Sequence, residues 1–143
     1  MCHTAFVLHK FLTKNKEIEL VLPETWQAKD LFDQLQQKMV DGTAFNLVIL
    51  VDGQPAGMID LHNLNHESGE VGYWLSNDFQ HLGIMTESVE FLKKYAFEQL
   101  KLDYLILRTH PKNSASQNVA KRSSFVYLKD DENGHKVFVL RNN

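Results

Sequence analysis

Residues 80–87 read Gln80-His81-Leu82-Gly83-Ile84-Met85-Thr86-Glu87 (QHLGIMTE) and lie between two segments of different periodicity. The preceding run, Glu70 to Leu75 (EVGYWL), is typical of a β-strand. After QHLGIMTE, apolar residues three and four apart predict a helix that runs to about Leu100. A loop that opens a helix exposes backbone N–H groups without intrahelical partners, and the helix dipole adds about half a positive charge. With Gly83 to let an anion approach the backbone, this stretch fits an anion site.

One glycine before a helix is a weak signal by itself. A plain connection and a phosphate cradle explain the spacing equally well. The stretch is neither the Gly-Lys-Ser/Thr phosphate loop of nucleotidases nor the three-glycine dinucleotide fingerprint. The low charge of the loop is no objection, because backbone N–H groups bind phosphate without a lysine.

The first half of the chain predicts a strand, a helix and a hairpin. Alternation over residues 17–22 predicts a strand that stops at Pro23, and an apolar stripe predicts a helix from Glu24 to about Gln37. Two β-rich runs, residues 45–51 and 56–62, flank Asp52-Gly53, which is a strong hairpin signal.

The second half predicts a strand over residues 103–109, a short helix over 114–122 with Asn113 as N-cap, and a hairpin of 125–128 with 136–140. The predicted order is therefore strand, helix, three strands, helix, strand, helix and two strands. This order indicates a mixed α/β or α+β sheet domain.

Composition limits the class of protein. With 143 residues and 43% hydrophobic content, we expect one domain over 1–143. A formal charge of −3 gives no basic footprint, so we expect no direct nucleic-acid partner. No apolar run approaches the ~20 residues of a membrane helix, and no signal-peptide cleavage site follows the start, so we expect a cytoplasmic protein without membrane contact. The single Cys2 excludes an intrachain disulfide and agrees with a reducing compartment.

Two histidines, His62 and His66, have a spacing seen in metal sites. They lie across a polar loop with no further evident ligand, and two ligands are too few for zinc. We therefore expect solvated histidines and no metal.

The stretch from Gly69 to Phe125 resembles one enzyme family specifically. QHLGIM is similar to the Q/R-x-x-G-x-G/A acetyl-CoA pyrophosphate loop of the GCN5-related N-acetyltransferases (GNAT). The order E-x-G-Y-W-L, Q-x-x-G-I-M-T-E, Y-A-F-x-x-L-x-L and N-x-x-S-x-x-V-A resembles the RimJ/RimL branch, which acetylates protein N-termini. With the upstream hairpin, the resemblance covers about residues 44 to 128. It implies a GNAT fold: a mixed, mostly antiparallel sheet of about six to seven strands, flanked by helices and splayed at the cofactor site.

The resemblance also implies roles for individual residues. Asn113 would support the cofactor arm, and Ser116 would sit where a general acid for the departing thiolate is expected. Many relatives use a tyrosine at the position of Ala120, which leaves Ser116 as the acid. Strand residues 72–75 would splay to bind the pantetheine arm, and backbone N–H groups of residues 80–86 would bind the pyrophosphate. The implied acetyl-CoA-binding residues are Gly72, Tyr73, Trp74, Leu75, Gln80, His81, Leu82, Gly83, Ile84, Met85, Thr86, Asn113 and Ser116.

The acetyl transfer that the resemblance implies requires a free amine. At pH 7, deprotonating an α-amine with a pKa of about 8 costs roughly 1 kcal/mol, whereas a lysine near 10.4 costs about 4.6 kcal/mol. An α-amine thus needs only a modest base, often a carboxylate acting through water. Glu70 is the first candidate, with Asp60 and His62 behind it; as the alternative, Glu70 is a solvated charge at a strand end.

Two departures from the family pattern bear on function. Ser124 stands where the family has a glycine before Phe125. Residues 23–40 leave room for about one helix where relatives carry two that wall the acceptor cleft. One reading is an active N-acetyltransferase for a peptide N-terminus or small amine, with a possible homodimer supplying the missing wall. The alternative is a non-catalytic acyl-CoA-binding or interaction module.

Overall fold

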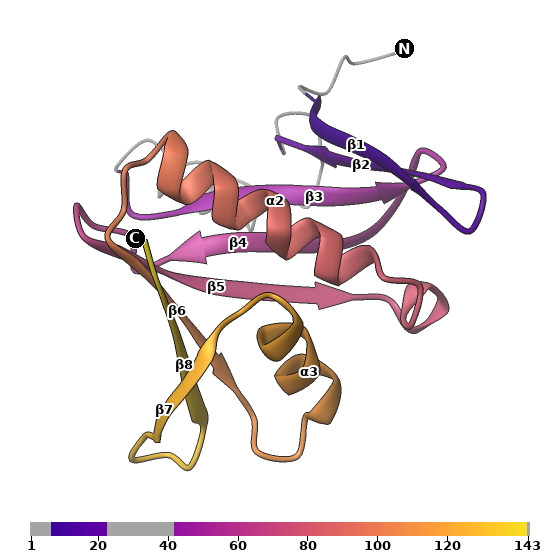
Figure 1. Cartoon of the computed structure of the whole chain (residues 1–143). Helices are drawn as coiled ribbons and strands as arrows, with labels where there is room; N and C mark the ends of the chain where they lie inside the picture. The colour runs from indigo at the N-terminus through magenta and orange to yellow at the C-terminus, as the bar shows by residue number, and fades with distance from the viewer. Residues whose placement is uncertain (1–6, 23–41, 143) are drawn as a thin grey trace, which may run out of the picture.

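A mixed sheet organises the part of the chain that the computed structural model describes, residues 7–22 and 42–142 (Figure 1). The predicted helix from Glu24 to Gln37 and the cysteine Cys2 lie outside these residues. Within them the sheet has eight strands in the order β1-β2-β3-β4-β5-β6-β8-β7. The elements along the chain are β1 (Val7–Thr13), β2 (Lys16–Val21), β3 (Phe45–Val51), β4 (Gln54–His62), β5 (Ser68–Leu75), the 3₁₀-helix η1 (Asn77–Phe79), α2 (Ile84–Glu98), β6 (Tyr104–Thr109), α3 (Ser114–Arg122), β7 (Val126–Asp130) and β8 (Lys136–Arg141).

Tight turns join most of the antiparallel strands. Asp52 and Gly53 have φ of 49° and 81°, so the Asp-Gly signal does close the β3–β4 hairpin as predicted. The β1–β2 hairpin was not predicted, and it raises the strand number above the expected six to seven. Its turn uses Lys14 and Asn15 at φ of 51° and 65°, where a sequence pattern leads one to look for glycine.

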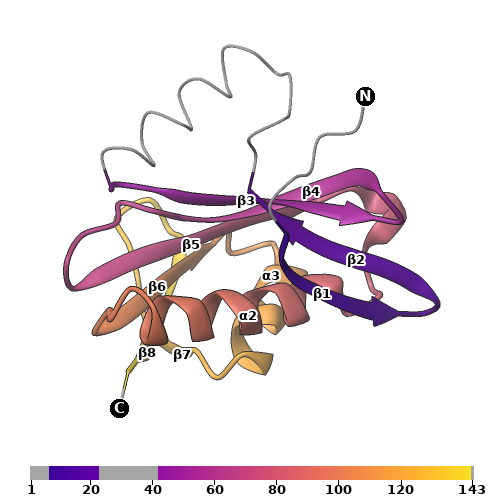
Figure 2. The same ribbon diagram turned by 90° about the horizontal axis from the view of Figure 1, so that it is seen from above.

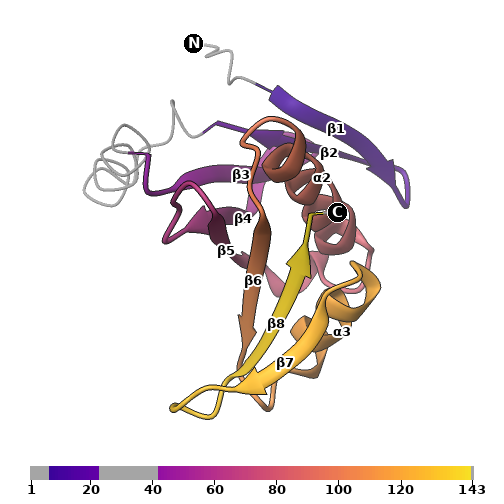
Figure 3. The same ribbon diagram turned by 60° about the vertical axis from the view of Figure 1, so that its left-hand side comes forward.

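The connection β5–α2–β6 is the one parallel step among the described strands. Ser68 to Val71 on β5 pair with Tyr104 to Leu107 on β6, and the pairing stops there. Beyond that point β6 turns away from β5 toward the β7–β8 hairpin, and α3 lies beside the divergence (Figures 1 and 3). The divergence of β5 and β6 after Val71 and Leu107 therefore leaves an opening in the sheet at the carboxyl end of β5.

The main core lies between the sheet and the two described helices, which occupy the same side of the sheet (Figure 2). In α2, Val89, Leu92 and Ala96 are fully buried, as the helical spacing predicted, and α2 ends at Glu98. They pack against alternate residues of the strands, because successive side chains of a strand point to opposite faces. None of the helices in the described ranges is long and apolar enough to cross a membrane.

Candidate functional site

The opening between β5 and β6 exposes one end of β5. Gly72 to Leu75 pair with β4 but not with β6, since the β5–β6 register ends at Val71 and Leu107. Backbone groups on that edge of β5 are therefore free of strand partners over these residues. This is the splay that the family resemblance implied for residues 72–75.

The loop before α2 presents the start of a helix without a side-chain cap. Gly83 is the N-cap residue at φ 79°, and a Cβ placed on it would have nothing within 4 Å. His81 also has a positive φ, 65°, so the loop twists twice before the helix begins. The first helical N–H groups, from Ile84 onward, are those that an α-helix leaves without intrahelical partners. The geometry suits an anion with several oxygens.

Hydrogen bonds hold this loop in place from two sides. The Gln80 amide donates to the Leu75 carbonyl at 3.0 Å and to the Asn77 side chain at 3.1 Å. The Thr13 hydroxyl, from the last residue of β1, donates to the Leu82 carbonyl at 2.6 Å. The backbone N–H of Gln80 already donates to the Asn77 carbonyl at 3.3 Å, so the N–H groups available to an anion begin after Gln80.

The start of α3 faces the same region. Asn113 is its N-cap, as predicted, and its side-chain oxygen accepts from the Ser116 N–H at 3.0 Å. The Tyr73 hydroxyl, from β5, lies 2.8 Å from Ser116 Oγ and donates to the Ser116 carbonyl at 3.3 Å. Burial raises the pKa of Tyr73, while the bond to Ser116 opposes the rise. Two hydroxyl groups, both protonated at neutral pH, thus meet at this end of the opening.

These pieces surround one pocket of about 340 Å³. Of the residues that the resemblance implied for acetyl-CoA, only Gly72 and Leu82 are absent from its lining. Leu82 packs on the core, and Gly72 faces the opposite side of the sheet. The lining residues are Tyr73, Trp74, Leu75, Gln80, His81, Gly83, Ile84, Met85, Thr86, Asn113, Ala115, Ser116, Asn118, Val119 and Arg122.

Four residues that line this pocket were not among the expected site residues. Ala115, Asn118, Val119 and Arg122 come from α3, at the three-and-four spacing that puts residues on one helix face, so the pattern could have shown them. Arg122 is a cation near the uncapped helix. The contact between Tyr73 and Ser116 had no signal in the sequence, because it joins residues 43 apart.

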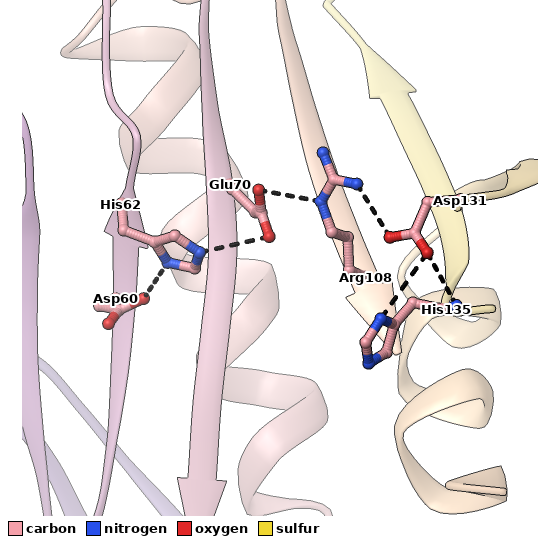
Figure 4. A network of polar contacts seen from close by, with 6 residues as sticks. All are labelled: Asp60, His62, Glu70, Arg108, Asp131 and His135. Atoms are coloured by element: carbon pink, nitrogen blue, oxygen red, sulfur yellow. Dashed lines mark hydrogen bonds and ion pairs between the residues drawn. The ribbon is translucent and has the colours of Figure 1, made fainter. Parts of the chain in front are cut away.

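On the opposite face of the sheet, charged side chains form a continuous chain (Figure 4). His62 Nδ1 lies 3.0 Å from Asp60, and His62 Nε2 lies 3.3 Å from Glu70. Arg108 then joins Glu70 to Asp131, at 3.2 Å each, and Asp131 meets His135 at 3.7 Å. This ion-pair chain crosses from β4 through β5 and β6 to the β7–β8 turn, so it bridges the opening in the sheet.

The ion-pair chain determines the charge of His62 and Glu70. Hydrogen bonds to Asp60 and then to Glu70 raise the pKa of His62 to about 9, so His62 is a cation at neutral pH. The hydrogen bond from His62, opposed by burial and aided by Arg108, lowers the pKa of Glu70. Glu70 is therefore an ionised carboxylate, with one oxygen on His62 and the other on Arg108.

These contacts change two expectations. The Glu70 side chain is only 14% exposed and lies in two ion pairs, so it is not a solvated charge at a strand end. His62 lies between two carboxylates and is not a simple solvated histidine, whereas His66 is exposed. Among residues 7–22 and 42–142, no three His, Cys, Asp or Glu side chains are grouped to hold a metal ion.

The residue that replaces the family glycine lies at the end of α3. Ser124 has φ 70°, and the Phe125 N–H donates to the Ala120 carbonyl at 2.9 Å while the Ser124 N–H donates to that of Lys121. These bonds form a Schellman motif, in which glycine is usual at the left-handed position. The fold accommodates the serine by placing it in the left-handed conformation.

Known proteins resemble this chain in sequence and in fold. It is 38% identical to "Putative ribosomal N-acetyltransferase YdaF" of Bacillus subtilis (strain 168) over 80 residues, or 54% of this chain and 44% of that protein. The chain spans about half the length of the curated relatives it matches, 44% in one case and 51% in another.

Among solved structures, the RimL ribosomal L7/L12 α-N-protein acetyltransferase without ligand has a TM-score of 0.79 at 17% identity, over 96% of this chain and 93% of that one. The microcin C7 self-immunity acetyltransferase MccE, in complex with acetyl-CoA and AMP, has a TM-score of 0.73 at 19% identity, over 87% and 92%. At these identities the likeness shows the fold. The family model of the acetyltransferase (GNAT) domain matches residues 6–126, and the chain belongs to that family.

Proposed function

We propose that this chain transfers the acetyl group of acetyl-CoA to a primary amine, the α-amine of a protein or peptide or that of a small molecule. The observation that carries the proposal is the single pocket that joins an uncapped helix start, a free strand edge and the Tyr73–Ser116 hydroxyl pair. The membership of the GNAT family supplies the reaction class. The family and the pocket together support an active acetyltransferase more strongly than either does alone.

The residues present fit the shape and charge of acetyl-CoA. The N–H groups from His81 to Thr86 would hold the pyrophosphate, with open space at Gly83 for the phosphate oxygens. The unpaired edge of β5 over Tyr73 to Leu75 would hydrogen-bond the pantetheine arm, in the manner of an added strand. Asn113 and Ser116 line the same pocket.

The transfer needs two proton movements and one bond exchange. The amine nitrogen forms a bond to the thioester carbonyl carbon, the carbon–sulfur bond breaks, and its electron pair leaves with the sulfur. The amine gives up a proton to a base, and the departing thiolate gains one from an acid. In our proposal Ser116 faces the sulfur as the acid, and Glu70 accepts the amine proton through water.

The electrostatics of Glu70 favour an α-amine as acceptor. Because His62 and Arg108 lower its pKa, Glu70 is a weak base. An α-amine, with a pKa of about 8, is partly deprotonated near neutral pH, whereas a lysine near 10.4 needs far more help. Asp60, which meets His62 through one oxygen, is the second candidate for the base.

The names of the relatives suggest the kind of acceptor. One matched relative is named a ribosomal N-acetyltransferase, and a structural neighbour acts on a ribosomal protein α-amine. A cytoplasmic location would give this chain access to such an acceptor. A second subunit could complete the acceptor wall.

Binding and turnover together test the proposal. Acetyl-CoA should raise the melting temperature with saturation, and at 100 times its Kd should stabilise the native state by about 2.7 kcal/mol, whereas adenosine diphosphate should do less. Peptides with a free N-terminus should then be acetylated faster than peptides with a blocked N-terminus and a free lysine. Binding without turnover on any amine would leave the non-catalytic acyl-CoA-binding module. The absence of binding would overturn the proposal.

A further inference from the structure

On the face of α3 that lines the pocket, Ser116 meets a side chain from the sheet. Ser116 and Ala120 are four residues apart in α3, so they lie on one face of the helix. Ala120 is fully buried and ends at Cβ. The hydroxyl of Tyr73, from β5, lies beside Ser116 at the first turn of this helix.

We infer that Tyr73 and Ser116 act as one proton-donating pair, in which Tyr73 supplies the proton that Ser116 passes to the departing thiolate. This inference rests on the proposed function and deepens it. In the proposed function Ser116 would face the reacting sulfur and would be the catalytic residue, and Tyr73 is a positioning residue that acts through it.

The geometry supports this division of work. Tyr73 Oη lies 2.8 Å from Ser116 Oγ, a normal distance for an O–H···O bond, and both residues line the pocket. The single proton of the Tyr73 hydroxyl can point to the Ser116 carbonyl, 3.3 Å away, or to Ser116 Oγ, and the shorter contact with Oγ is the arrangement that supplies a proton to Ser116. A serine hydroxyl alone is a poor acid because the alkoxide that it leaves is strongly basic. A phenol, even one whose pKa burial raises, is a much stronger acid than a serine hydroxyl, so Tyr73 can replace the proton that Ser116 gives up.

The proton balance closes without another reactant. The carbon–sulfur bond breaks with its electron pair on sulfur, which takes the Ser116 proton, while Ser116 takes the proton of Tyr73. The tyrosinate then regains a proton from solvent, equal to the one that the amine released. The products are the amide and free coenzyme A thiol.

Substitutions at both positions test the pair. In Tyr73→Phe and in Ser116→Ala, we expect kcat with acetyl-CoA to fall by about a hundredfold, and the Kd of acetyl-CoA to stay within about twofold. The double variant should be no slower than the slower single variant, because both changes interrupt the same proton path. The matched control is Tyr127→Phe, which removes another hydroxyl that makes a side-chain hydrogen bond, away from the pocket, and should leave kcat unchanged.

An isosteric change separates proton supply from packing. Replacing Tyr73 by 3,5-difluorotyrosine keeps the ring and the hydrogen bond but makes the hydroxyl more acidic, so the alkaline limit of kcat should move to lower pH. The inference would be overturned if the alkaline limit of kcat did not move. It would also be overturned if Tyr73→Phe kept kcat within twofold of wild type, or if the losses in kcat multiplied in the double variant. If the wild type binds acetyl-CoA but acetylates no amine, the proposed function fails instead.

Discussion

The two faces of the sheet meet at the same opening but use different chemistry. On the helix side, a neutral pair of hydroxyl groups, Tyr73 and Ser116, lines the pocket. On the other side, the ion-pair chain from Asp60 to His135 crosses the opening (Figure 4). A neutral hydrogen bond is insensitive to salt, whereas partly exposed charges are screened within about 10 Å at 0.1 M salt. The stability of the pocket face should therefore depend on packing, and the stability of the charged face on pH and ionic strength.

Two glycines of adjacent strands test the packing on each face, and the largest effect belongs to Gly57. A Cβ on Gly57 would overlap the backbone carbonyl of Trp74, next to the pocket, and backbone cannot swing aside. We expect Gly57→Ala to lower the free energy of unfolding by about 3 kcal/mol and to weaken acetyl-CoA binding. Urea denaturation measures the first effect, and calorimetric titration the second.

Gly72→Ala is the matched control on the charged face. There the new Cβ would meet side-chain atoms, Asp60 Oδ1 at 2.7 Å and His62 Cε1 at 3.0 Å, which can rotate away. Gly72→Ala should lower the free energy of unfolding by about 1 kcal/mol and should change acetyl-CoA binding little. Equal losses for the two variants would contradict the idea that packing dominates only on the pocket face.

Glu70→Gln tests the charged face directly. The amide removes the anion that His62 and Arg108 share, so two cations are left facing each other across the opening. We expect a loss of roughly 2 kcal/mol at low salt, smaller in 1 M salt, together with a lower kcat if Glu70 is the base. Glu90→Gln, which breaks the pair with Lys93 at a carboxylate more exposed than that of Glu70, should cost less than about 0.5 kcal/mol. A loss independent of salt would indicate packing as its cause.

Separate kinetics on Asp60→Asn would decide between the two candidate bases. If Asp60→Asn lowers kcat more than Glu70→Gln does, the base is Asp60, and Glu70 only positions the side chains of the ion-pair chain.

The charge on His62 predicts a pH dependence. Its pKa rises from 6.5 to about 9 on folding, so its contribution is complete below pH 6.5 and is lost as the pH rises through 9. Because the side chain is 39% exposed, solvent screening leaves about 1 kcal/mol of this contribution. Stability measured by urea denaturation should fall between pH 6.5 and 9.5 in wild type and less in His62→Gln. The exposed His66→Gln should retain the wild-type slope, and a shared loss of slope would contradict the assignment.

The difference between the faces also explains what the sequence could and could not predict. The Asn113 cap and the loop at Gly83 depend on local patterns of turns and caps, which a sequence displays, whereas the splay after Val71 was implied by the family resemblance alone. The Tyr73–Ser116 bond and the ion-pair chain join residues far apart in the chain, so only the folded sheet brings them together.

The β1–β2 hairpin was missed for a local reason. Lys14 and Asn15 adopt positive φ without glycine, so no standard turn signal marks it, and its strand Val7–Thr13 is interrupted by polar residues. Pairing with β2 overrides these weak preferences.

The smallest effect concerns the turn between α3 and β7, on the pocket side. Ser124 holds φ 70° where a side chain costs about 1 kcal/mol or more, but glycine loses more entropy on folding. Ser124→Gly should therefore stabilise the fold by about 0.5 kcal/mol, seen as a melting temperature higher by about 1–3 °C. Ser124→Ala keeps the strain and should give no gain. Because Ser124 is exposed and absent from the pocket lining, acetyl-CoA affinity should not change in either variant. A change in affinity would mean that the backbone at Ser124 positions α3, and with it Ser116, for the cofactor.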